Sequence, residues 1–162
     1  RTNTRFADDD YPAMFMYNAI LGGFAHSKLF VNVREKASLA YYASSKIESH
    51  KGIITIQSGI KPENEEKALK IIRQQLDDMR RGDISDDEMK KTISVLTNQL
   101  KEIKDRPFEL INYHYHSVLG GTTRTLEQFM QAIRETTRDD VIDAAQKVEL
   151  DTIYFLRNKT GS

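Results

Sequence analysis

The sequence predicts an α+β fold, in which an antiparallel β-sheet is covered by α-helices. Two β-rich stretches, at residues 39–48 and 52–60, follow each other directly along the chain. Several helical stretches then follow without strands between them, which does not fit a doubly wound fold of alternating strands and helices. A last β-rich stretch, residues 152–156 (TIYFL), predicts a third strand. Three strands make a small sheet, so we expect a further strand upstream of Arg1 in a longer polypeptide.

The first predicted helix covers the apolar run at residues 11–21. Three consecutive aspartates, residues 8–10, precede this run, and aspartate caps the free amide groups of a first helical turn. Pro12 also suits that turn. Gly22 and Gly23 are predicted to end the helix, because glycine tolerates the left-handed conformation found just past a helix.

A second, short helix is expected from its N-cap Ser27 to about Lys36. The pattern then changes to strand, since residues 39–48 are rich in Tyr, Ser and Ile and residues 52–60 carry several β-branched side chains. Residues 49–52 are typical of a hairpin turn, so we expect the two strands to pair antiparallel.

The remaining helices are predicted from capping residues, helix breakers and apolar spacing. Ser85 with Glu88 forms a capping box, and Thr125 and Thr137 are further N-cap candidates. The predicted helices cover residues 62–81, 85–104, 107–119, 125–133 and 137–148.

The composition is that of an ordinary globular domain, which we expect to span residues 1–162 as one part of a longer protein. Its 24 basic residues balance 24 acidic ones, so there is no long-range reason to expect nucleic acid or an anionic membrane as a partner. The sequence has no cysteine, which excludes disulfides and thiolate sites. No apolar run has the length of about 20 residues that a membrane span needs. No secretory signal is visible, and we therefore expect a cytoplasmic protein.

Arg34 and Tyr41 are the candidate substrate-binding residues. Their separation of seven residues lets the arginine leave the end of a short helix while the tyrosine starts a strand. A guanidinium and a phenol could then converge on a peptide oxygen that becomes negative in a tetrahedral intermediate. Alternatively, Arg34 pairs with a neighbouring carboxylate and Tyr41 packs in the sheet. Spacing alone favours this alternative, because exposed arginines commonly pair with surface acids.

A longer motif surrounds these two residues, in the order LGG at 21–23, SKLF at 27–30, VREK at 33–36 and LAY at 39–41. This layout resembles the C-terminal half of the pitrilysin, insulysin and mitochondrial-processing-peptidase family of zinc peptidases, in its bacterial type. The likeness covers almost the whole chain, and residues 21–45 carry most of its specificity. The family's Arg and Tyr that contact the substrate backbone map onto Arg34 and Tyr41. Tyr42 should face the other way, because successive strand side chains point to opposite faces.

The zinc motif of this family, His-x-x-Glu-His, is missing from the sequence. None of the four histidines, at positions 26, 50, 114 and 116, has a Glu-His partner at the needed offset. We therefore expect no metal ligand and no catalytic residue in this chain. The resemblance implies that zinc and the general base lie in another domain or subunit.

The resemblance implies the substrate-binding C-terminal domain of a zinc metalloendopeptidase that processes or degrades peptides. Its partners would be a peptide substrate and a zinc-bearing N-terminal half, in the same chain or in a paralogous subunit. By itself this chain is expected to be inactive. The alternative is a non-catalytic partner or scaffold subunit of the same family. An unrelated α+β ligand-binding domain remains open only if the central motif is a chance match.

Overall fold

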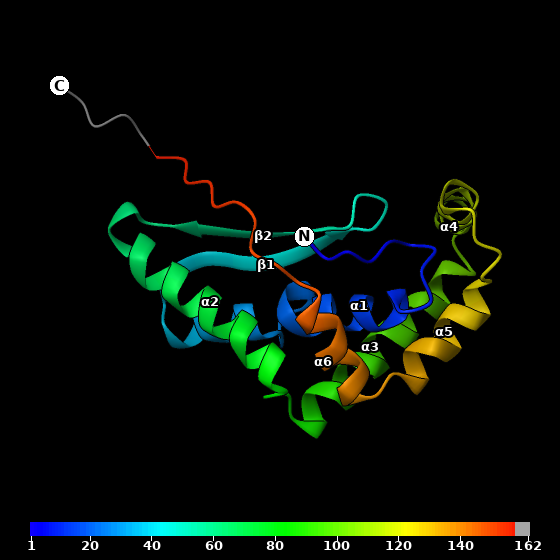
Figure 1. Ribbon diagram of the computed structural model, residues 1–162, viewed down its shortest axis with the longest axis horizontal. Helices are drawn as coiled ribbons and strands as arrows, with labels where there is room; N and C mark the ends of the chain where they lie inside the picture. The colour runs from blue at the N-terminus through cyan, green and yellow to red at the C-terminus, as the bar shows by residue number, and fades with distance from the viewer. Residues whose placement is uncertain (158–162) are drawn as a thin grey trace.

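The computed structural model describes residues 1–157 (Figure 1). Within these residues it has six α-helices, two π-helices, a short 3-10 helix and one two-stranded antiparallel sheet. The elements are α1 (Tyr11–Asn18), η1 (Ala19–Gly23), η2 (Phe30–Lys36), β1 (Ala40–Glu48), β2 (Ile53–Ile60), η3 (Pro62–Asn64), α2 (Glu65–Arg81), α3 (Asp86–Ile103), α4 (Pro107–Gly120), α5 (Leu126–Glu135) and α6 (Arg138–Gln146). The predicted α+β class with an antiparallel sheet is confirmed.

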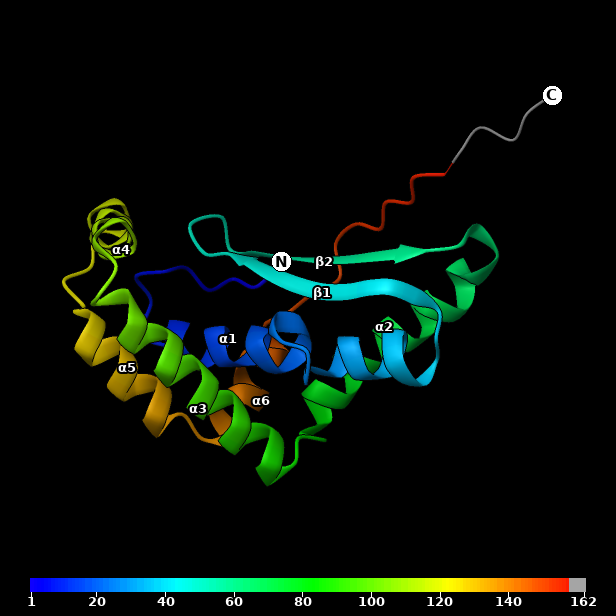
Figure 2. The ribbon, with the colours of Figure 1, turned by 180° about the vertical axis from the view of Figure 1, so that it is seen from behind.

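The two strands form the predicted hairpin. Their register runs from the pair Glu48–Ile53 beside the turn to the pair Ala40–Ile60 at the open end. In both views the hairpin forms one layer, and the helices α1, α2, α3, α5 and α6 lie on one side of it (Figures 1 and 2). Helix α4 stands at one end, beside the hairpin turn.

The core is centred on α1 and η1, which lie beneath the hairpin. This segment is apolar on nearly all sides, so it is buried on nearly all sides. Its fully buried side chains include Met14, Met16, Tyr17, Ile20 and Leu21. The surrounding layer is built from α5 and α6 on one side and the inner face of β1 on the other.

Gly22 allows this central segment to lie directly against β1. A Cβ added at Gly22 would lie 2.4 Å from the backbone nitrogen of Ser45 and 2.9 Å from the side chain of Leu29. Neither Gly22 nor Gly23 has a positive φ, so the predicted left-handed helix end is wrong. The helix instead widens into the π-helix η1 and then leaves into an extended Phe24. Gly22 is therefore required because the close packing leaves no room for a side chain, and not because of its backbone conformation.

The capping predictions hold for the later helices. The capping box of α3 at Ser85 and Glu88 is formed, and Thr125 and Thr137 cap α5 and α6 in the same way. Asp10 precedes α1 but makes no side-chain cap. Its carboxylate accepts a hydrogen bond from Thr4 and pairs with Lys147 instead.

The predicted third strand at residues 152–156 is wrong for the described part of the chain, where this segment is extended coil without a ladder partner. A strand requires a neighbouring backbone to pair with its amide and carbonyl groups. The backbones of Arg1 and Glu149 do exchange two hydrogen bonds, of 2.8 and 2.9 Å, but the pairing ends there. Ile153, Tyr154 and Leu156 are consequently exposed. No helix in residues 1–157 has the length and apolar character to cross a membrane.

Candidate functional site

The candidate site lies where η2 leads into β1, and the backbone there departs from regular geometry at three successive places. Arg34 lies on η2, a seven-residue π-helix, and π-helical turns are rare and frequent at functional sites. Ser38 has a positive φ of 51°, a conformation that costs a non-glycine residue about 1–3 kcal/mol. The β1–β2 register then shifts between Ala40 and Tyr42, so that Tyr41 is the extra residue of a bulge. Bulges re-aim side chains and are common beside active sites.

These irregularities bring Arg34 and Tyr41 together. The Nε of Arg34 donates a hydrogen bond of 3.0 Å to the backbone carbonyl of Tyr41. The guanidinium also lies over the ring of Phe30, 4.5 Å from its centroid. Both contacts fix the direction of the arginine, while the phenol of Tyr41 stays open, with the residue 71% exposed.

An open hollow of about 570 Å³ lies beside this pair and is lined by Arg34, Glu35, Ser38, Leu39, Ala40, Tyr41, Lys61 and Asn64. We call it the Arg34 hollow. Within residues 1–157, no ion pair engages Arg34, and its two terminal nitrogens have no hydrogen-bond partner. The predicted alternative, in which a neighbouring carboxylate pairs with the guanidinium and Tyr41 is packed in the sheet, is therefore not what the structure shows.

Tyr42 lies on a different part of the surface. Its ring covers Gly59 of β2, where an added Cβ would lie 2.5 Å from the ring, and its carbonyl accepts a hydrogen bond from Ser58. Tyr42 does not line the Arg34 hollow, although it is 52% exposed. The two neighbouring tyrosines thus differ in position but not greatly in exposure.

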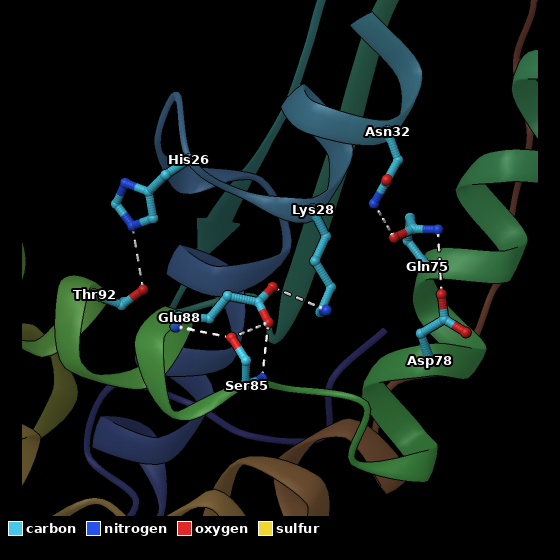
Figure 3. A network of polar contacts seen from close by, with 8 residues as sticks. All are labelled: His26, Lys28, Asn32, Gln75, Asp78, Ser85, Glu88 and Thr92. Atoms are coloured by element: carbon cyan, nitrogen blue, oxygen red, sulfur yellow. Dashed lines mark hydrogen bonds and ion pairs between the residues drawn. The ribbon is translucent and has the colours of Figure 1, made fainter. Parts of the chain in front are cut away.

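A polar network anchors the segment that carries Arg34 to the helices α2 and α3 (Figure 3). Lys28 is nearly buried and pairs with Glu88 at 2.9 Å, at the first turn of α3. Asn32 donates a hydrogen bond of 2.6 Å to Gln75 on α2. His26 contacts Thr92 of α3 at 3.3 Å. These side chains hold η2 in place from two sides.

Glu88 is the charged centre of this network. Its Oε2 accepts hydrogen bonds from the backbone amide and the hydroxyl of Ser85, while Oε1 faces Lys28. Partial burial by itself raises the pKa of Glu88, but the hydrogen bonds from Ser85 and Lys28 outweigh burial and lower this pKa below its ordinary value of 4.5. Glu88 is therefore ionised at neutral pH and holds Lys28 as a charge-assisted partner.

The histidines do not form a metal site. In the part of the chain that the structure describes, no group of three His, Cys, Asp or Glu side chains is placed to hold a metal ion. His50 and His116 hydrogen-bond to each other at 2.7 Å, with rings stacked 4.9 Å apart between the hairpin turn and α4. His26 stacks on Phe24. The residues present therefore do not fit the zinc ion that the family resemblance implies for a complete enzyme.

Lys61 also lines the Arg34 hollow but is not among the site residues predicted from the sequence. The predicted hairpin nevertheless indicates that Lys61 lies near the site. Lys61 directly follows β2, and antiparallel pairing places the end of β2 beside the start of β1, where Tyr41 lies.

Comparisons with known proteins agree with this architecture. The sequence model of the peptidase M16 inactive domain matches residues 2–96. A Bacillus subtilis protein described as "Probable inactive metalloprotease YmfF" is 43% identical over the whole chain, which spans 38% of that protein. A Streptomyces coelicolor protein described as "Uncharacterized zinc protease SCO5738" is 30% identical over 93% of the chain, which spans 34% of it.

Solved structures show the same fold. A conserved protein from Enterococcus faecalis superposes with a TM-score of 0.85 at 36% identity, over 91% of this chain and 35% of that one. The peptidase M16 inactive domain from Pseudomonas fluorescens superposes with a TM-score of 0.71 at 23% identity, over 89% of this chain and 35% of that one. The chain thus spans little more than a third of these relatives. The family match, which covers more than half of the sequence, identifies the chain as a member of the peptidase M16 inactive domain family.

Proposed function

We propose that this chain is the substrate-binding C-terminal domain of a zinc-dependent metallopeptidase, and that Arg34 and Tyr41 contact the backbone of the bound peptide. One observation carries the proposal: a guanidinium with unpartnered terminal nitrogens and an exposed phenol line the same open hollow. Both groups donate hydrogen bonds, and both would face a peptide carbonyl that enters the hollow.

The role of the two residues is positioning and charge stabilisation. The Nε contact to the Tyr41 carbonyl fixes the guanidinium, so its remaining donors are oriented before a peptide binds. Hydrogen bonds that strengthen as negative charge develops on the carbonyl oxygen would lower the barrier to cleavage. An inactive domain of a peptidase family implies a partner domain or subunit, and we assign zinc and the general base to that partner.

The test measures peptide hydrolysis by the full-length protein, together with any paired paralogue, in the presence and absence of a chelator. Arg34→Ala is expected to lower turnover about 10²- to 10³-fold. Arg34→Lys should restore little of it, because lysine keeps the charge but lacks the fork that contacts the Tyr41 carbonyl and the hollow together. The matched control is Arg73→Ala, which removes an exposed arginine of α2 away from the hollow. Cleavage that resists the chelator, or full turnover with Arg34→Ala, would refute the proposal.

A second function has a specific observation in its favour. The Bacillus subtilis relative, 43% identical to the chain, is described as an inactive metalloprotease. The chain could accordingly belong to a non-catalytic partner or scaffold subunit. Peptide binding without cleavage, by the full-length protein with all partners present, would identify this case.

A further inference from the structure

The Arg34 hollow is lined by two cationic residues, Arg34 and Lys61. Lys61 is held at its edge by the turn into η3, since its carbonyl accepts a hydrogen bond of 2.9 Å from the backbone amide of Asn64. The pairing of Ala40 with Ile60 brings this turn beside Tyr41. Arg34 lines the hollow from η2, so the two cations approach it from different elements.

The described residues balance the charge of these cations only in part. None of the ion pairs within residues 1–157 involves Arg34 or Lys61. Among the described residues, Glu35 is the one acid that lines the hollow, against Arg34 and Lys61, so their side chains contribute a net charge of +1. A concave surface with excess positive charge favours an anionic group.

We infer that the Arg34 hollow recognises a carboxylate of the bound peptide, and that Lys61 is the residue that selects it. The inference rests on the proposed function and adds a preference to it: Arg34 and Tyr41 hold the peptide backbone, and Lys61 contacts an acidic group next to that backbone. The carboxylate comes either from an aspartate or glutamate side chain or from the C-terminus of the peptide.

The experiment measures dissociation constants of fluorescent peptides for the full-length protein with chelator present, so that no peptide is cleaved. One pair of peptides differs by glutamate or glutamine at a single position, which is moved along the sequence. A second pair differs by a C-terminal acid or amide. The wild type should bind the acidic member of one pair about fivefold more tightly, the upper range for an exposed ion pair.

Lys61→Gln should abolish this preference, so that the acidic and the neutral member of the pair bind with equal affinity. Glu35→Gln should increase the preference, because it removes a repelling charge from the same hollow. Lys51→Gln is the matched control, since it removes an exposed lysine at the opposite end of the hairpin. The pair of peptides that shows the effect identifies the source of the carboxylate.

The outcomes separate the two proposals. If Lys61→Gln keeps the acidic preference, or if Lys51→Gln loses it equally, the carboxylate assignment is wrong while the backbone contacts stand. If Arg34→Ala and Tyr41→Phe bind both members of each pair as tightly as the wild type does, the proposed function itself is wrong, and the Lys61 inference is overturned with it.

Discussion

At the scale of single residues, the candidate site depends on contacts that are not visible as motifs. Gly22 lies against the backbone of Ser45, at a point where even one methyl group has no room. This contact sets the distance between η1 and β1.

Gly22→Ala should destabilise the domain by about 1–3 kcal/mol, the usual cost of forcing an extra carbon into a packed interior. Gly23→Ala is the neighbouring control, because its added Cβ would meet atoms only at 3.5 Å or more, an ordinary contact distance. Urea unfolding of both variants of the 162-residue chain measures the difference. Equal stability of the two variants would show that the close approach is not tight in solution.

Glu88 makes the network below η2 sensitive to acid. Its pKa is lowered in the folded state, so its contribution to stability is fully present above the unfolded value of 4.5 and is lost as the pH falls through the folded pKa. Glu88→Gln should cost about 2 kcal/mol at pH 7. The free energy of unfolding of the Glu88→Gln variant should then fall less than that of the wild type as the pH drops below 4.5.

Urea unfolding at a series of pH values between 7 and about 3 checks this prediction. Asp87→Asn is a suitable control, because Asp87 precedes Glu88 in the same helix but pairs only with the exposed Lys91. A parallel pH dependence for Glu88→Gln and the wild type would contradict the assigned role of the Lys28–Glu88 pair.

At the scale of the elements, the sequence correctly predicts those features that local chemistry determines. The capping boxes of α3, α5 and α6 and the β1–β2 hairpin follow from side chains within a few residues of each other. Features that depend on the packing of distant segments are not predicted by these local patterns. Examples are the π-helical geometry of η1 and η2 and the bulge at Tyr41. These features arise where two layers of the fold meet, and the spacing of residues in the sequence does not predict them.

The candidate site is likewise predicted only in part by the sequence. Arg34 and Tyr41 are predicted by the family resemblance, because spacing alone favours an ordinary ion pair for Arg34. Lys61 was missed because its nearness to Tyr41 is a consequence of the strand register. The segment 152–156 was predicted as a strand from its side chains, but a strand also depends on a backbone partner, which side-chain patterns do not supply.

The backbone contacts of Arg1 and Thr2 indicate where such a partner belongs. Arg1 pairs with Glu149, and the amide of Thr2 donates to the carbonyl of Gly52 at the start of β2. A strand that continues backward from Arg1 would therefore run between β2 and residues 151–157. We predict that residues upstream of Arg1 form this strand in a protein that, like the relatives of this chain, is longer than the chain.

Hydrogen exchange measured on the full-length protein and on the 162-residue chain tests this strand. Amides of residues 152–156 should be protected in the full-length protein and exchange rapidly in the shorter chain. The amides of β1 that donate hydrogen bonds to β2 serve as the internal reference. Rapid exchange of 152–156 in both proteins would contradict the predicted strand.

At the scale of the whole molecule, the chain matches only about a third of the length of its relatives. It spans 38% of its Bacillus subtilis relative and exposes apolar side chains along α4, such as Phe108 and Val118. Exposed apolar faces of this kind are typical of interaction surfaces. Its described residues offer a hollow with hydrogen-bond donors but no metal cluster. The proposed substrate-binding role rests on this hollow.

The central claim is that the Arg34 hollow holds the peptide that is cleaved, and the neighbouring tyrosines test it most directly. The measurement is the rate of peptide hydrolysis by the full-length protein with Tyr41→Phe and with Tyr42→Phe. Each change removes one exposed phenol hydroxyl, and only Tyr41 lines the hollow. We predict that Tyr41→Phe lowers turnover by about 10²-fold and that Tyr42→Phe leaves it near the wild-type rate. Equal rates for the two variants would contradict the account.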